Sequence, residues 1–172
     1  MAGVMIIRCT KKLLKELRIQ PVDVEDASPV GSWHANLLHV DRRKCAIVTH
    51  DLTLFTLFMP GLRRAEFDRF DDVFGQALFR TMRLFDFEQR LIECMLDRSR
   101  SNLYTTTNDR SVLGSMNDMA FHIRYFIDAF GGLSVADLDE IATRINRTPF
   151  KAIGFAYPSE RFADMLDSAG CA

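Results

Sequence analysis

The sequence predicts a single α+β domain, in which an antiparallel β-meander packs against about five or six helices. Two observations support this fold class. Apolar runs of strand length cluster between residues 33 and 59, whereas the period of the apolar residues becomes helical after residue 65. Strands and helices that cluster, rather than alternate, favour an α+β fold over a doubly wound parallel sheet. With 172 residues, the chain has the length of one ordinary domain, so we expect residues 1–172 to form one unit.

The β-rich region accounts for most of the predicted sheet. Three strand-length runs occupy residues 34–40, 44–50 and 53–59, and very short connections separate them. Such connections require antiparallel neighbours, so the three runs predict a meander. The β-branched run at residues 4–9 and the Tyr- and Thr-rich segment at 102–107 are expected to add further strands.

Helices are predicted between and after these strands. Thr10 is placed to cap a short helix that follows the first strand. Apolar residues at helical spacing over 67–78 predict a second helix, and Asp86 with Gln89 has the spacing of a capping box for a third.

The C-terminal part is predicted to be mainly helical. Residues 115–118, Ser-Met-Asn-Asp, have capping-box spacing ahead of a helix that Gly131 and Gly132 close. A further helix should follow Asp137, and Pro158 should begin the last one. The apolar residues 150–156 predict a final strand.

Charge and cysteine content exclude several classes of protein. Lys and Arg total 22 and Asp and Glu total 23, so the net charge of −1 is far from that of a typical nucleic-acid-binding protein. The four cysteines form no C-x-x-C pair and no secretory signal precedes them, so we expect reduced thiols and a cytoplasmic protein. No apolar run is long enough to cross a membrane. Metal-ligand spacings and glycine-rich cofactor loops are also missing, so no metal or cofactor is expected.

A basic cluster follows the first strand. Arg8, Lys11 and Lys12 could bind phosphate, and Cys9 between them could be a reactive thiol. The alternative is a buried strand cysteine followed by a solvated basic helix, and we favour it because free cysteines are among the most buried residues.

The second candidate is the polar segment 105–118. Free N–H groups at a helix start attract anions, and nearby polar side chains would add contacts. The alternative is that these residues only cap the helix and shape the loop. The candidate binding residues here are Asn108, Arg110, Ser111, Ser115, Asn117 and Asp118.

The third candidate is the start of the meander, where Trp33, His34 and Asn36 follow a Gly-Ser pair. The single tryptophan could stack on a base or anchor a protein partner. The alternative, which we favour, is a core tryptophan that closes one end of the sheet.

The same segments carry a resemblance to a known family. Residues 8–14 (Arg-Cys-Thr-Lys-Lys-Leu-Leu), 33–38 (Trp-His-Ala-Asn-Leu-Leu) and 108–118 (Asn-Asp-Arg-Ser-Val-Leu-Gly-Ser-Met-Asn-Asp) resemble the hallmark blocks of a family of short prokaryotic proteins, a domain of unknown function. The likeness spans most of residues 5–157 and implies no particular activity. It does favour residues 110–118 and 33–36 as functional positions.

Three functions follow as hypotheses. The leading one is a non-catalytic protein with a regulatory or toxin-neutralising role, which binds another macromolecule through residues 105–118 and the region of Trp33, with a protein as the expected partner. The second is an enzyme acting on a phosphate-bearing small molecule or RNA. Arg8, Lys11, Lys12 and Arg110 would bind the phosphate, and His34 or Asp118 would act as acid or base. The third is a nucleic-acid-binding protein, because the first 64 residues are net basic. Exposed phenylalanines would also allow a homodimer.

Overall fold

A computed structural model describes residues 3–25 and 28–171. Within them, five strands form one mixed sheet, which confirms the α+β fold class. The strands are β1 (Met5–Cys9), β2 (Trp33–Val40), β3 (Arg43–His50), β4 (Thr56–Met59) and β5 (Asn102–Thr106). Their order across the sheet is β4-β3-β2-β1-β5. The predicted meander is therefore present as β2, β3 and β4, and both additional strands belong to the same sheet.

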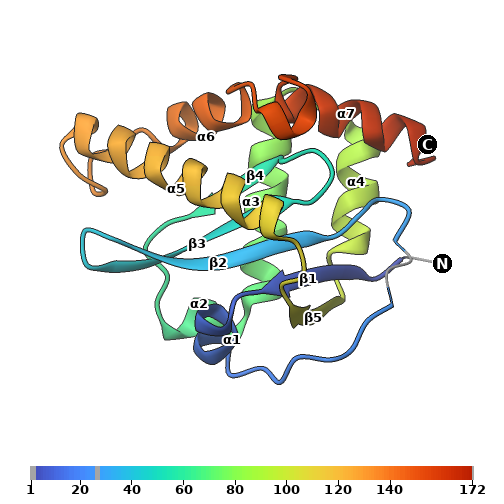
Figure 1. The fold of residues 1–172 in the computed structure, drawn as a ribbon, viewed down its shortest axis with the longest axis horizontal. Helices are drawn as coiled ribbons and strands as arrows, with labels where there is room; N and C mark the ends of the chain where they lie inside the picture. Colours follow the sequence, from blue (N-terminus) through green and yellow to red (C-terminus); the bar gives the residue numbers. More distant parts are fainter. Residues whose placement is uncertain (1–2, 26–27, 172) are drawn as a thin grey trace.

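The described residues also form seven α-helices and one short 3-10 helix. The α-helices are α1 (Lys11–Leu17), α2 (Arg64–Asp68), α3 (Phe70–Leu84), α4 (Gln89–Arg98), α5 (Arg110–Phe130), α6 (Leu138–Asn146) and α7 (Pro158–Ser168). The 3-10 helix is η1 (Lys151–Ile153). Figure 1 shows the sheet crossing the middle of the molecule, with α5 and α6 on one side and α1 and α2 on the other.

Strand direction explains how the two halves of the sheet join. Each meander strand runs antiparallel to its neighbour. In contrast, β1 lies parallel to both β2 and β5, because helical segments connect these strands and return the chain to the same end of the sheet. Consequently the C-terminal ends of β1 and β5 lie together, beside the start of β2.

The sheet separates two hydrophobic cores. Alternate strand residues such as Ile7 and Ala35 pack on one face with apolar residues of α1, α2, α3, α4 and α7. On the other face, Leu38 and Ile47 pack beneath α5 and α6. The face under α5 is the one that carries the candidate residues described below.

Asn146, the last residue of α6, closes part of the sheet edge. Its side-chain Oδ1 accepts a hydrogen bond from the main-chain N–H of Thr56 at 2.8 Å, and its Nδ2 donates to the carbonyl of Thr56 at 2.9 Å. Both residues are fully buried. The amide thus satisfies main-chain groups that an edge strand would otherwise leave unpaired.

Several predicted boundaries are wrong. The helix expected over 67–78 is two helices, α2 and α3, separated at Arg69, whose backbone leaves the helical region. Asp86 does not cap α4: it has a left-handed backbone (φ 54°), and the helix begins at Gln89. Residues 150–156 form η1 and a turn instead of a strand, because Phe150 and Ile153 reach the core from a compact loop.

The predicted capping box at residues 115–118 is also wrong. The helix starts earlier, at Arg110, with Asp109 as its N-cap. Ser115 therefore lies inside α5 on its buried side, and Asp118 lies on its exposed side. Gly131 ends the helix in a left-handed conformation (φ 96°), as predicted.

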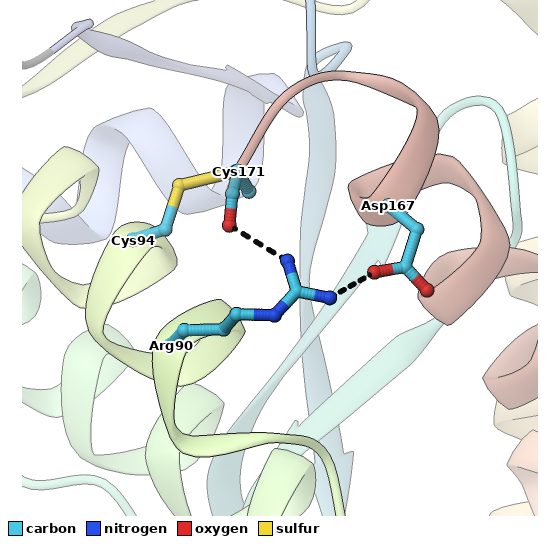
Figure 2. Close-up of a disulfide and its surroundings, with 4 residues drawn as sticks. All are labelled: Arg90, Cys94, Asp167 and Cys171. Atoms are coloured by element: carbon cyan, nitrogen blue, oxygen red, sulfur yellow. Dashed lines mark hydrogen bonds and ion pairs between the residues drawn. A yellow bond between two sulfur atoms is a disulfide. The ribbon is translucent and has the colours of Figure 1, made fainter.

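The expectation that all cysteines are reduced is wrong for two of them. Cys94 in α4 and Cys171 near the end of the chain form a disulfide, with their Cα atoms 5.8 Å apart. Figure 2 shows this bond beside Arg90, which donates to the Cys171 carbonyl and to the Asp167 carboxylate. Spacing in the sequence could not reveal the pair, since 77 residues separate the two cysteines. The prediction of a cytoplasmic protein loses the support it drew from reduced thiols.

Candidate functional site

A row of polar side chains crosses all five strands on the face that α5 covers. The strand register places them side by side in the order Thr105, Arg8, His34, Thr49 and Thr56. None is more than 6% exposed, although such residues usually lie at a surface. The hydroxyl oxygens of Thr49 and Thr56 are 2.9 Å apart. We call these five residues the polar row; it is a buried polar band within the hydrophobic layer beneath α5.

His34 is the centre of this row and connects three parts of the chain. Its Nδ1 lies 2.6 Å from Oδ1 of Asp51, in the turn after β3, and its Nε2 lies 3.4 Å from the main-chain nitrogen of Asn108. Because the Asn108 N–H donates to Nε2, the ring proton sits on Nδ1 and is donated to Asp51. Both ring nitrogens are thus occupied and the ring is fully buried. This arrangement fixes the loop before α5 to the sheet and leaves neither nitrogen open to a substrate.

Two of the family-like segments meet beside the row. The Thr10 hydroxyl donates to Oδ1 of Asn36 at 2.8 Å and accepts from the main-chain N–H of Leu13 at 3.5 Å. The main-chain N–H of Thr10 also donates to the carbonyl of Ala35 at 3.0 Å. The predicted Thr10 cap is therefore confirmed, and Asn36 holds it in place.

The start of α5 is already occupied by a carboxylate. Oδ1 of Asp109 accepts hydrogen bonds from the main-chain N–H groups of Ser111 at 2.8 Å and Val112 at 3.2 Å. The N–H of Asn108 points to His34 instead. The donors and the positive end of the helix dipole, which an external anion would use, therefore serve Asp109. This geometry supports the capping alternative for Asn108 and its neighbours.

The exposed side of α5 brings the other candidate residues into one surface. Arg110, Ser111, Gly114, Asn117 and Asp118 are all exposed, at spacings of three and four residues. The same line continues to Phe121 and Tyr125, which are 68% and 62% exposed. We call this set of seven residues the α5 outer face. Its first half is the family-like block and its second half is a pair of large aromatic side chains.

Gly114 has no packing role within the chain. It lies in the middle of a long helix, and a Cβ atom placed there would meet no atom within 4 Å. Glycine in an exposed helix interior is about 1 kcal/mol less favourable than alanine. The absence of a side chain at this position therefore leaves the helix backbone open to close approach from outside.

Neighbouring groups hold the aromatic half in position. The rings of His122 and Phe126 stack with centroids 6.3 Å apart, and the guanidinium carbon of Arg144 in α6 lies 5.1 Å from the centroid of Phe126. The ring of Phe121 lies 5.9 Å from that of His122. Phe126 is half-buried in this arrangement, whereas Phe121 and Tyr125 project beyond it.

Trp33 does not join this surface. It is fully buried on the opposite side of the sheet, where its ring contacts His50, Phe74 and Phe162 at centroid distances of 5.0, 5.5 and 5.6 Å. Strand alternation sends consecutive side chains to opposite faces, so Trp33 and His34 point away from each other. The interpretation of Trp33 as a core residue is confirmed, and a partner could not reach its ring in this fold.

The basic cluster of the first strand and helix is divided. Arg8 is buried in the polar row, whereas Lys11 and Lys12 are exposed at the start of α1, whose leucines pack on the opposite core. Arg110 is exposed at the start of α5. Burial also raises the pKa of the Cys9 thiol to about 12, which disfavours the thiolate of a reactive cysteine.

Residues 3–25 and 28–171 contain no group of three or more His, Cys, Asp or Glu side chains arranged to hold a metal ion. Within the same residues, no helix combines the length and apolar character needed to span a membrane.

Sequence reasoning missed Asp51, Thr49 and the two exposed aromatics. Asp51 and Thr49 lie next to His34 only because of the register between β2 and β3, which no local pattern specifies. The exposure of Phe121 and Tyr125 could have been predicted from the helical period of the apolar residues. Met119, Ile123 and Ile127 face the core, which leaves positions 121 and 125 on the outside.

Comparisons with known proteins place these segments in a family. The comparison with curated proteins found no match. A family model for a domain of unknown function, DUF6933, matches residues 6–161 and so includes the polar row and the α5 outer face. Because this match covers most of the chain, the protein belongs to the DUF6933 family.

Proposed function

We propose that this protein is a non-catalytic interaction domain that binds a helix of another protein on the α5 outer face. The observation that carries the proposal is the pair Phe121 and Tyr125, one turn apart and 68% and 62% exposed. Tyrosine and phenylalanine on an ordered element supply large contact area with little loss of rotamer freedom, which is why aromatic residues are enriched in interfaces.

Gly114 supports a helical partner. A second helix can approach most closely where the first helix has no side chain, and Gly114 leaves such an opening on the same face as the aromatics. The partner helix would cross α5 near Gly114 and place apolar side chains against Phe121 and Tyr125. Such helix recognition relies on anchors spaced along one face.

The charge of this surface favours a protein over a nucleic acid. The exposed charged side chains of α5 are two arginines, Arg110 and Arg124, and two acids, Asp118 and Asp128, which lie near the aromatics. A phosphate backbone would require a clear excess of basic groups. A mixed surface around an aromatic centre is the composition of a protein interface.

The hypothesis of a phosphate-processing enzyme has less support. It needs Arg8 and Arg110 in one open cleft, with His34 or Asp118 as a free acid or base. Arg8 is buried, Arg110 is exposed on α5, and both nitrogens of His34 are occupied. These positions favour the hypothesis of a non-catalytic interaction domain.

Photocrosslinking in the native host tests the proposal. Tyr125 is replaced by p-benzoylphenylalanine, and the matched control carries the same group at Phe79, an exposed aromatic of α3. We expect a discrete protein adduct from position 125 and not from 79, and Gly114→Leu should abolish it while the melting temperature stays near that of the wild type. Adducts at both positions, or an adduct that nuclease removes, would contradict a specific protein-binding face. Mass spectrometry identifies the partner.

A further inference from the structure

Strand β4 has one main-chain position whose polar groups face outward and are unpaired. In an antiparallel ladder, alternate residues direct their N–H and C=O groups toward the partner strand. The N–H of His50 donates to the carbonyl of Phe55, so Phe55 directs its main-chain groups toward β3. The next residue, Thr56, therefore directs its N–H and C=O outward, where both pair with Asn146. Two residues further on, Phe58 must also point its N–H and C=O away from β3.

The flanking residues isolate this position. The outward groups of Thr56 are taken by Asn146, and Pro60 has no N–H to offer. None of the described residues pairs with the outward N–H and C=O of Phe58. A long peptide strand could not continue along this edge in either direction, but a single amide group could pair here.

The open position borders a pocket of about 250 Å³ between α3 and α6. Its walls are mainly apolar and include Phe58, Val73, Ala77, Leu84, Leu138 and Ala142. Arg80 of α3 and Asp139 of α6 also line it and form an ion pair at 2.7 Å that links the two helices. Both side chains are more than half exposed, so the charged pair lies at the rim. Apart from Gln76 and Thr81, the remaining lining residues are apolar.

We propose that this pocket binds a small carboxamide with a short aliphatic group. The amide would donate to the Phe58 carbonyl and accept from its N–H, and the aliphatic group would occupy the apolar interior. The neighbouring outward position supplies the precedent, because the carboxamide of Asn146 makes the same two bonds with Thr56 at 2.9 and 2.8 Å. A volume of about 250 Å³ suits a ligand smaller than most drug molecules. This site is separate from the α5 outer face and does not depend on the proposed function.

Two nearly isosteric probes test the pairing. 4-Methylpentanamide carries the amide and a 3-methylbutyl group, and 5-methylhexan-2-one replaces the amide NH₂ by a methyl group that cannot donate. Each is titrated into ¹⁵N-labelled wild-type protein, and the main-chain resonance of Phe58 is followed by NMR. We expect saturable binding of the amide, with the Phe58 N–H resonance moving to lower field. The ketone should bind about five-fold more weakly, the factor for one lost hydrogen bond.

Filling the pocket provides an independent check. Ala142→Phe places a ring in the pocket from α6, and Ala129→Phe makes the same change on an exposed position of α5. Ala142→Phe should lower the affinity for 4-methylpentanamide at least ten-fold, and Ala129→Phe should leave it unchanged. The proposal is overturned if the Phe58 resonance shows no saturable shift in the wild type, or if the ketone binds as tightly as the amide. Unchanged binding in a folded Ala142→Phe protein would also overturn it.

Discussion

Asn146 takes the place of a neighbouring strand for Thr56. The two residues lie 90 positions apart in the sequence, yet the side-chain amide of one forms both the hydrogen bonds that a sixth strand would make with the other. The same Nδ2 also donates to the carbonyl of Ala142 at 3.0 Å, within its own helix. The end of α6 is therefore joined to the sheet edge by polar contacts inside a hydrophobic layer.

Replacing Asn146 by alanine should be strongly destabilising. Asn146→Ala leaves the buried N–H and C=O of Thr56 without partners, and we expect the free energy of unfolding to fall by about 3 kcal/mol. Denaturation in guanidinium chloride measures the change. Asn117→Ala, on an exposed position of α5, should stay within about 0.5 kcal/mol of the wild type. Equal effects of the two substitutions would show that the amide pairing contributes little.

His50 should make stability depend on pH. Burial lowers the pKa of its ring to about 4, from the usual value of 6.5, and Nε2 lies 2.6 Å from the carbonyl oxygen of Val30. In the unfolded state the His50 ring takes up a proton at higher pH than in the folded state. The contribution of His50 to the free energy of unfolding is therefore complete above pH 6.5 and is lost as the pH falls toward 4. We expect the protonation of His50 to lower the free energy of unfolding by about 3 kcal/mol.

The measurement for His50 compares unfolding free energies between pH 7 and pH 4. Carboxylates also titrate in this range, so the wild type is compared with His50→Gln, which lacks the ionisable ring. The variant should be less stable at pH 7 and should lose less stability on acidification. Parallel pH profiles for the two proteins would refute the role assigned to His50.

Gly114 inside α5 and Gly131 at its C-cap should respond in opposite directions to replacement by alanine. Gly114→Ala adds a methyl group in open space and should raise the free energy of unfolding by about 0.5–1 kcal/mol. Gly131→Ala forces a side chain into a left-handed conformation at φ 96° and should lower it by about 1 kcal/mol. Thermal unfolding of both variants gives the comparison. A destabilising Gly114→Ala would mean that the position is not open as described.

The disulfide between Cys94 and Cys171 should contribute about 4 kcal/mol to stability, because it closes a long loop of the unfolded chain. A double Cys94→Ala, Cys171→Ala variant should unfold at correspondingly lower denaturant concentration. Addition of dithiothreitol should shift the wild type to the same midpoint and leave the variant unchanged. If reductant has no effect on the wild type, the bond is not formed in the purified protein.

Local patterns were sufficient for much of the fold. Thr10, Gly131 and Pro158 mark element ends through short-range chemistry, and the meander follows from the short connections between its strands. They failed where the signal was ambiguous. The Ser-Met-Asn-Asp run at 115–118 has the letters of a capping box, but Asp109 lies closer to the true start of the helix and its carboxylate accepts the first N–H groups.

The candidate site was less predictable because it depends on contacts between distant segments. His34 and Arg8 were recognisable as unusual residues, but their alignment with Thr49, Thr56 and Thr105 depends on strand order and register. The exposure of Phe121, in contrast, follows from the helical period, because Met119, Ile123 and Ile127 form the apolar face of α5. The pairing of Cys94 with Cys171 required the packing of α7 beside α4.

The disulfide also changes what limited proteolysis of this protein will produce. Residues 94–171 form a covalently closed ring that contains β5, α5, α6 and α7. A protease that cuts one of the connecting loops, such as residues 131–137 or 147–157, would open this ring without releasing either fragment. The nicked protein would migrate as one species on a non-reducing gel and as two after reduction, and the fragment carrying α5 would stay tethered to the rest of the molecule.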